Sequence, residues 1–281
     1  MKARIFSTII LWALVASLLS AKGIVGGFFL LIIASTYTQL ELYQLMEKSG
    51  WKPFKVSATI LGILMLYGCL FLREGITDFS YILIFLALSI IIFSIPVILS
   101  DKPEQLKTVF LPTIFGMVYV PTMLSFPILF INKLSIFTET TLPLLLVLWI
   151  IVVVKFSDVG GLLFGHSFGK HKIVPHFSPK KTYEGLIGSI IFSILSGHIF
   201  ASCCGNYWPS KFTKLSIGIL STLLAIVSLI SDLIESGFKR LANEKDSGTS
   251  IPGIGGVFDL TDSLILTLPL GIIIIKEFIL N

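Results

Sequence analysis

Acidic side chains are concentrated near the C-terminal end of the sequence, in a polar stretch whose spacing suits phosphate chemistry. Six of the 16 Asp and Glu residues lie there: Asp232, Glu235, Glu244, Asp246, Asp259 and Asp262. Residues three, four and seven positions apart share one face of an α-helix, so Asp232, Ser236 and Lys239 are expected to face one way. Asp259 and Asp262 are likewise three positions apart, at the start of an apolar run. Two helix ends could therefore bring carboxylates and a lysine to one place.

The segment between these two helix ends is rich in glycine. Four glycines and a proline lie between positions 248 and 256, a composition that excludes a regular helix. Its backbone N–H groups, those of Gly255 and Gly256 among them, can approach a ligand closely. Carboxylates without Cys or His nearby suit a hard cation such as Mg²⁺, and Lys239 beside Arg240 suits phosphate oxygens. This combination predicts phosphoryl or nucleotidyl transfer, with a solvated charged loop as the alternative interpretation.

A second polar segment, residues 155–184, is basic and interrupted by glycines. It contains five lysines, and Asp158 and Glu184 lie near its two ends. At a membrane surface such a loop could hold a nucleotide triphosphate or an anionic lipid headgroup, although the same lysines could serve only to fix the topology. Its histidines recur every five residues, which does not match the four-residue spacing of a helical metal pair: His166, His171 and His176.

The rest of the chain is strongly apolar. Hydrophobic residues make up 54% of the sequence and charged residues only 13%, about half of what is usual for a soluble domain. Because roughly 20 apolar residues cross the hydrocarbon core as a helix, we predict an all-α, polytopic integral membrane protein and exclude an ordinary soluble enzyme. About nine transmembrane helices are expected, over residues 5–21, 23–42, 54–72, 79–99, 108–131, 142–157, 185–204, 214–234 and 262–280.

The N-terminal start raises two further expectations. A basic start followed by an apolar run imitates a signal peptide, but no good cleavage site precedes Lys22, so we interpret this run as a retained first helix. The first two spans almost touch, which predicts a tight helical hairpin or one bent element. We expect N-terminal transmembrane helices over 1–140 and a C-terminal catalytic region over 141–281, which contains the polar segments 155–184 and 232–262.

The basic residues indicate which way the chain faces. With nine spans, 15 of the 21 Lys and Arg residues fall on one side of the membrane. Since cytoplasmic loops carry the excess of Lys and Arg, the N-terminus and both polar segments are predicted to be cytoplasmic. The net charge of +5 then reflects topology, and no basic stripe with interleaved aromatic residues predicts binding of nucleic acid.

The polar residues closely resemble the signature of the phosphatidate cytidylyltransferase (CDP-diacylglycerol synthase) family. The resemblance covers residues 155–263 and is carried by Ser178-Pro-x-Lys181-Thr182-x-Glu184-Gly185, Ser236-x-x-Lys239-Arg240, Lys245-Asp246-Ser247-Gly248, Pro252-Gly253-x-Gly255-Gly256 and Asp259-x-x-Asp262-Ser263. Three positions depart from the family pattern, since Ser231, Ile254 and Leu260 stand where the family usually has Gly, His and Arg. All the matching carboxylates are present, which favours an active enzyme.

The resemblance implies an enzyme that transfers CMP from CTP to phosphatidic acid, giving CDP-diacylglycerol and pyrophosphate. It implies Mg²⁺ as cofactor, with room for a second cation, and a homodimer with a funnel that faces the cytoplasm. The compact length favours a bacterial inner membrane. The catalytic residues would be Asp232, Lys239, Arg240, Asp246, Asp259 and Asp262, with Asp232, Asp259 and Asp262 surrounding the metal. The substrate-binding residues would be Ser178, Lys181, Thr182, Glu184, Ser236, Gly255 and Gly256.

Two other functions use similar ingredients. A CTP-dependent polyprenol or phytol kinase is also a membrane enzyme, but it releases CDP rather than pyrophosphate. A transporter or channel can bind ions with membrane carboxylates, but it is expected to carry charges at mid-span or inverted repeats. Here the carboxylates cluster at one end of the helices and no repeat is evident.

Overall fold

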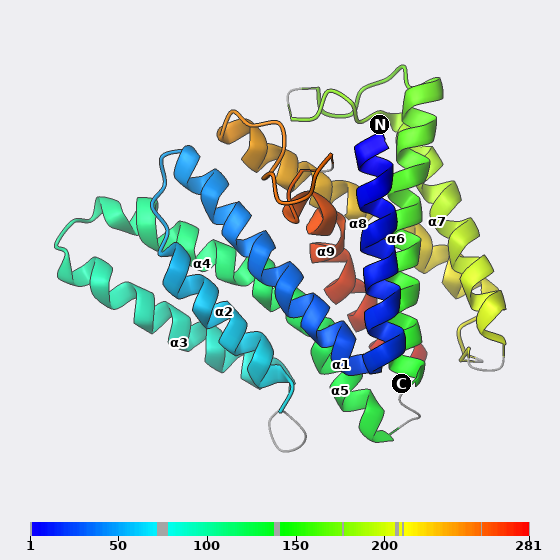
Figure 1. Cartoon of the computed structure of the whole chain (residues 1–281), viewed down its shortest axis with the longest axis horizontal. Helices are drawn as coiled ribbons and strands as arrows, with labels where there is room; N and C mark the ends of the chain where they lie inside the picture. The colour runs from blue at the N-terminus through cyan, green and yellow to red at the C-terminus, as the bar shows by residue number, and fades with distance from the viewer. Residues whose placement is uncertain are drawn as a thin grey trace. The chain divides into compact units, whose positions relative to one another are not determined.

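The computed structural model describes residues 2–71, 78–137, 141–175, 177–205, 208–209, 211–253 and 255–280. Within these ranges every regular element is helical, which confirms the predicted all-α class (Figure 1). The α-helices are α1 Lys2–Lys48, α2 Lys55–Cys69, α3 Asp78–Leu99, α4 Leu111–Met117, α5 Met123–Phe137, α6 Thr141–Phe168, α7 Tyr183–Cys204, α8 Lys214–Leu241 and α9 Phe258–Ile274. Short π-helical turns are η1 Leu106–Phe110, η2 Val118–Thr122 and η4 Ile275–Leu280.

Several helices are long and apolar enough to cross a membrane, so the chain is a multi-pass membrane protein. Among the described residues there are seven such stretches: Gly23–Lys48, Ser80–Leu99, Leu106–Asn132, Leu142–Phe168, Tyr183–Cys204, Lys214–Leu241 and Phe258–Glu277. The predicted number of nine is not confirmed. The span expected at 54–72 corresponds to α2, which has only 15 residues. The side chains of the span expected at 5–21 lie almost entirely outside the described part.

Two local features shape the N-terminal helices. Helix α1 is broken at Gly23, whose φ of 53° and ψ of −130° are not helical, so the predicted bent element is confirmed. A positive φ of this kind is open to glycine at little cost. Further on, η2 contains Pro121, which has no N–H to donate, and the local widening to a π-helical turn keeps Leu106–Asn132 continuous.

The chain forms two compact units, which we describe separately. Unit one comprises Met1–Asn132 and Phe238–Thr261, and unit two comprises Lys133–Gly237 and Asp262–Asn281. Unit one therefore includes the end of α8, the glycine-rich loop and the start of α9. The predicted division into N-terminal helices and a C-terminal catalytic region concerns function and stays a prediction.

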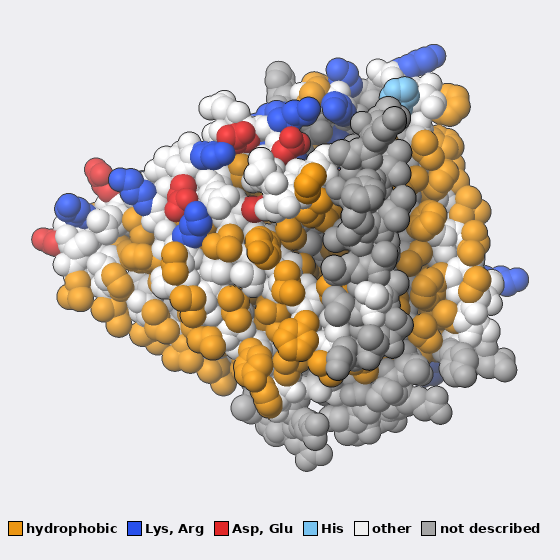
Figure 2. Space-filling model, viewed as in Figure 1, with side chains coloured by type: hydrophobic (Ala, Val, Ile, Leu, Met, Phe, Trp, Pro, Cys, Tyr) orange, Lys and Arg blue, Asp and Glu red, His pale blue; other side chains and the backbone are white. Residues whose placement is uncertain are grey.

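In unit one, α2, α3 and α5 meet around a core of apolar side chains. Its fully or almost fully buried members are Met65, Leu66, Cys69, Ile82, Ile128 and Leu129. The outer faces of α2 and α3 are also apolar, with Val56, Ile60 and Leu64 among their exposed side chains. Figure 2 shows these orange faces, with charged side chains gathered where α1 ends and α2 begins. Such apolar outer faces are expected of helices that contact lipid.

In unit two, α6 and α7 pack with their backbones in close contact. A Cβ atom on Gly160 would collide with the carbonyl oxygen of Gly188 and the Phe192 side chain. A Cβ atom on Gly161 would lie 2.6 Å from Ser189 Oγ, which is also too close. Small residues at a helix–helix contact permit this approach in membrane proteins. The contact fixes the end of α6, which belongs to the polar segment 155–184, beside the start of α7.

Candidate active site

Six of the predicted site residues lie in two clusters, one in each unit. We call Glu41, Lys239, Ser247, Gly256 and Asp259 of unit one the loop cluster, because they surround the glycine-rich loop. We call Lys155, Asp158, Lys181, Asp232 and Asp262 of unit two the helix cluster, because most of them lie on helices α6, α8 and α9.

In the loop cluster, the Asp259 carboxylate binds both ends of the glycine-rich loop. Its Oδ1 accepts a hydrogen bond from Lys239 Nζ at 2.9 Å, an ion pair in which both side chains are largely buried. Its Oδ2 accepts from the backbone N–H of Ser247 at 2.9 Å, from the Ser247 hydroxyl at 2.8 Å and from the N–H of Gly256 at 2.7 Å. Asp259 lies in the first turn of α9, where the helix dipole favours a negative charge.

The glycines of this loop are needed for its backbone. Ile251 and Gly255 exchange two backbone hydrogen bonds, of 2.8 Å and 3.1 Å, around a tight turn through Pro252 and Gly253. Gly253 and Gly255 have positive φ angles of 79° and 126°, which other residues rarely adopt. A Cβ atom on Gly255 would also lie 2.5 Å from Asp259 Oδ2. Ile254, one of the departures from the family pattern, lies outside the described residues.

In the helix cluster, Lys181 and Asp232 form a close ion pair. Lys181 Nζ lies 2.5 Å from Asp232 Oδ2. Burial alone would lower the pKa of Lys181, but the Asp232 carboxylate and two further acidic groups more than offset it, so this pKa lies above its ordinary value. The other oxygen, Asp232 Oδ1, is buried and accepts no hydrogen bond from the part of the chain that the structure describes.

Asp158 and Asp262 complete the helix cluster. Asp158 accepts hydrogen bonds from the hydroxyls of Ser228 and Ser263, both at 3.0 Å, and Lys155 Nζ lies 3.4 Å from its Oδ2. The Asp262 side chain accepts from the Ser263 N–H at 2.7 Å. Asp158, Asp232 and Asp262 are close enough to interact electrostatically. Three helices of unit two thus contribute carboxylates to one polar region.

The structure adds four residues to which sequence reasoning gave no role. Asp158, at one end of the basic segment, also matches the family pattern as Asp158-x-Gly, and Lys155 is one of the segment's lysines, but neither was given a role. Ser231, a departure from the family pattern, donates a hydrogen bond from its hydroxyl to the backbone carbonyl of Asp262. Glu41, which has almost no exposed surface, lies on α1 in a region where the sequence shows nothing but a span.

The residues predicted around 178–184 hold the loop that carries Lys181. Thr182 caps α7, since its hydroxyl accepts a hydrogen bond from the N–H of Gly185 at 3.1 Å. Glu184 accepts from the backbone N–H groups of Lys170 and His171, and its Oε1 lies 2.7 Å from His171 Nδ1. Ser178 takes part in the turn that precedes Lys181 through its backbone. Contact of Ser178, Thr182 and Glu184 with substrate stays a prediction.

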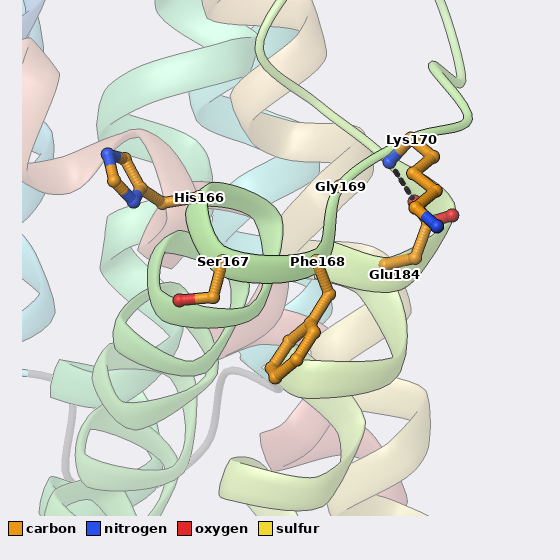
Figure 3. A pocket seen from close by; sticks show the side chains of 6 residues that line it. All are labelled: His166, Ser167, Phe168, Gly169, Lys170 and Glu184. Carbon is orange, nitrogen blue, oxygen red and sulfur yellow. Dashed lines mark hydrogen bonds between the residues drawn. The ribbon is translucent and has the colours of Figure 1, made fainter.

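An open hollow lies beside this loop, lined by the end of α6, residues 166–168, together with Gly169, Lys170 and Glu184 (Figure 3). The picture shows the Lys170 backbone bound to Glu184, while the His166 side chain points away from them. None of the residues of the loop cluster or the helix cluster lines this hollow, so it is not part of either cluster. Arg240 and Asp246 are exposed and Ser236 is half-buried, and they do not join either cluster through a described contact.

The donor set bears on whether the site suits Mg²⁺. Among the described residues no three His, Cys, Asp or Glu side chains are grouped tightly enough to enclose a metal ion. Mg²⁺ rarely uses such a cage, because it keeps several waters and binds through one or two carboxylates and substrate phosphates. Asp232 Oδ1, buried and without a hydrogen bond from the described residues, suits that mode. Asp259 does not, since four donors already occupy its carboxylate.

The fold and the two clusters define a class: a multi-pass membrane protein with carboxylate–lysine pairs at the polar ends of its helices. The sequence model of the cytidylyltransferase family matches residues 2–278. The chain therefore belongs to the cytidylyltransferase family, as the resemblance of its polar residues predicted.

Curated relatives agree with this assignment. The chain is similar to phosphatidate cytidylyltransferases of Staphylococcus haemolyticus, 39% identical over 127 residues that are 44% of this chain and 46% of the relative. The relative from Haemophilus influenzae is 38% identical over 126 residues, 45% of this chain and 44% of the relative. The relative from Staphylococcus aureus is 39% identical over 127 residues, which are 44% of this chain and 46% of the relative. Each match spans less than half the length of the relative.

Proposed function

We propose that this chain transfers CMP from CTP to phosphatidic acid, giving CDP-diacylglycerol and pyrophosphate for phospholipid biosynthesis. Family membership over residues 2–278 and relatives of that name support the proposal. The observation that carries it is the ion pair of Lys181 and Asp232, where a lysine kept protonated lies beside a buried carboxylate oxygen that accepts no hydrogen bond from the described residues. A positive charge and a hard oxygen donor side by side suit the phosphates of a nucleotide.

The reaction needs little covalent help from the protein. A phosphate oxygen of phosphatidic acid attacks the α-phosphorus of CTP, and the bond from that phosphorus to pyrophosphate breaks. The second pKa of a phosphate monoester is about 6, so the attacking oxygen is already anionic near neutral pH and needs no strong base. Lys181 would neutralise phosphate charge, and Lys239 and Arg240 stay predicted phosphate ligands.

We propose Mg²⁺ as the cofactor. Asp232 would hold it through Oδ1, and the nearby Asp262 and Asp158 carboxylates would add negative charge that favours a divalent cation. When bound, Mg²⁺ neutralises the converging phosphates and stabilises the leaving group. The predicted role of Asp259 as a third ligand is not supported by its hydrogen bonds in unit one.

Further expectations concern the setting of the site. The uneven distribution of basic residues supports an N-terminus and polar segments in the cytoplasm, where CTP is available and phosphatidic acid can enter from the lipid. The bacterial inner membrane and the homodimer remain proposals based on chain length and on the resemblance.

A transfer assay tests the function. The purified full chain would be incubated with phosphatidic acid, Mg²⁺ and CTP labelled at the α-phosphate, and the label would be followed into the organic phase. We expect a labelled lipid and released pyrophosphate, which would also show that Leu260 is a tolerated replacement. A kinase would instead release labelled CDP and leave the organic phase unlabelled, which would contradict the proposal. Reactions without phosphatidic acid or with a chelator serve as controls.

A further inference from the structure

A buried glutamate on α1 binds the glycine-rich loop from the other end of the sequence. Glu41 is 3% exposed, and each of its carboxylate oxygens accepts one hydroxyl and one backbone N–H. Oε1 accepts from Ser250 Oγ at 2.6 Å and from the N–H of Val257 at 3.1 Å. Oε2 accepts from Ser247 Oγ at 3.0 Å and from the N–H of Phe258 at 2.8 Å. Three of the donors belong to the segment that joins α8 to α9, and the fourth is the first residue of α9.

These bonds cap helix α9 with a residue of another helix. The first N–H groups of a helix have no partner within it, and the helix dipole attracts an anion there. Phe258 is the first residue of α9, and Val257 precedes it. An ionisable side chain in an apolar span is costly unless it is hydrogen-bonded. Glu41 has three donors of its own and shares the Ser247 hydroxyl with Asp259.

Two glycines of the signature make room for this carboxylate. A Cβ atom on Gly248 would lie 2.7 Å from Glu41 Oε1. A Cβ atom on Gly256 would collide with Glu41 Oε2 and with the Ser247 hydroxyl. The glycine composition predicts a backbone that can approach a ligand closely. In the structure the group that approaches Gly248 and Gly256 is the side chain of Glu41.

Ser247 connects Glu41 to the predicted catalytic residue Asp259. Its hydroxyl oxygen lies 3.0 Å from Glu41 Oε2 and 2.8 Å from Asp259 Oδ2. A hydroxyl has one proton and donates to one acceptor at a time. The hydrogen bonds of the two carboxylates are therefore linked, and a change at Glu41 alters the surroundings of Asp259 and of its partner Lys239.

We propose that Glu41 is the positioning residue of the glycine-rich loop: its carboxylate holds Ser247–Phe258 in place and, through Ser247, orients Asp259 for turnover. This inference rests on the proposed function for its catalytic consequence. Glu41 acts through the loop and takes no part in bond making. A misplacement of about 1 Å at a reacting centre can cost about 100-fold in rate, so a positioning role is expected to be visible in kcat.

The test compares Glu41→Gln with Glu47→Gln in the purified full chain. Glutamine keeps the size of Glu41 but directs an NH₂ group at donors, whereas Glu47 lies exposed on the same helix and pairs with Lys55. Hydrogen exchange is measured for peptides that cover 247–258, and kcat and KM for CTP are measured by label transfer. For Glu41→Gln we expect exchange at Val257 and Phe258 at least tenfold faster and kcat at least tenfold lower, with a smaller change in KM. Glu47→Gln should match the wild type, and Glu41→Asp should recover part of kcat.

Each result decides a separate point. Unchanged exchange in Glu41→Gln would overturn the inference, and so would faster exchange with a normal kcat. If the wild type transfers no label, the proposed function fails, while the exchange data still decide whether Glu41 holds the loop. If Glu41→Gln does not purify as a folded protein, Ser250→Ala removes only one of the four donors. It should then speed exchange of the same peptide to a lesser degree, and no effect there would overturn the inference.

Discussion

Asp232 has two carboxylate oxygens in different surroundings. Oδ2 accepts a hydrogen bond from Lys181 Nζ at 2.5 Å, while Oδ1 is buried and accepts no hydrogen bond from the described residues. A buried acceptor that stays unsatisfied costs about 1–3 kcal/mol, and such a cost at a polar cluster is typical of a site that completes itself with a ligand. Asp232 is therefore the residue at which the proposed cation is most readily tested.

The substitution Asp232→Asn is expected to lower kcat by about 100-fold or more while the protein stays folded. The amide has the same shape but no charge to offer a cation, and the loss of one charged group at a transfer site typically has this size. Label transfer measures the effect, and Asp101→Asn, an exposed residue after α3, is the matched control. Near-normal turnover of Asp232→Asn would remove Asp232 from the site.

Lys181 is expected to stay protonated throughout the physiological range. Its pKa is raised above the ordinary 10.5, so its stabilising effect is fully present below that pH and is lost only as the pH rises through the higher value of the folded protein. The thermal stability of the wild type should therefore show no loss due to Lys181 between about pH 6 and pH 9.

The variant Lys181→Gln should lower kcat/KM at least tenfold, since the carboxylate of Asp232 loses its partner and the phosphates lose a positive charge. Lys180→Gln is the control, because Lys180 is the adjacent lysine and is exposed. Label transfer at several CTP concentrations compares the two. Equal activity of both variants would show that the basic residues of this loop act only in topology.

At the scale of single residues, the sequence named candidates where spacing and signature are local. Helical spacing predicted that Asp232 and Lys239 face one way, but in the structure Asp232 pairs with Lys181 and Lys239 pairs with Asp259, in different clusters. The resemblance to the family signature named Asp259 and Asp262. Glu41 could not be found in this way, because it is 206 positions from Ser247 and no period connects the two. Ser231 looked like a departure from the pattern, and only the fold shows that its hydroxyl bonds to the Asp262 carbonyl.

At the scale of elements, the close backbone contact of α6 and α7 predicts that a larger residue at Gly160 destabilises the protein. Gly160→Ala would place a methyl group against the Gly188 carbonyl oxygen, which cannot move as a side chain can. We expect a loss of about 1–3 kcal/mol of stability, the usual cost of overpacking. Gly218→Ala is the control, since a Cβ atom there meets nothing within 4 Å. Thermal unfolding in detergent measures both, and an equal melting temperature would contradict the close packing.

Helical spans were predictable from the sequence because their apolar runs have the length of a bilayer. The number of spans was harder to predict. Helix α2 has only 15 residues, and the first two apolar runs both belong to α1, which bends at Gly23. The π-helical turns η1 and η2 leave no clear pattern in a continuously apolar segment. Packing partners such as Gly160 and Gly188 were likewise not predictable, since spacing describes one helix and not its neighbour.

At the scale of the whole molecule, the two polar segments are expected on the same side of the membrane. Two predicted crossings, α7 and α8, lie between them, so the uncertain count of spans before α6 does not affect this expectation. In a variant without Cys203 and Cys204, Lys172→Cys and Thr249→Cys should react with an impermeant maleimide only from the cytoplasmic side. In the wild-type chain, Cys203, exposed at the far end of α7, should react from the opposite side. Labelling of all three from one side would contradict the topology.

The bond between Glu41 and Ser247 also has a consequence in time. During synthesis Glu41 leaves the ribosome 206 residues before Ser247. At about 5–20 residues per second, its carboxylate waits roughly 10–40 s for its donors. During that interval the Glu41 carboxylate lacks the donors that it contacts in the folded protein. We therefore expect this carboxylate to gain its final hydrogen bonds only after residues 247–258 have been translated.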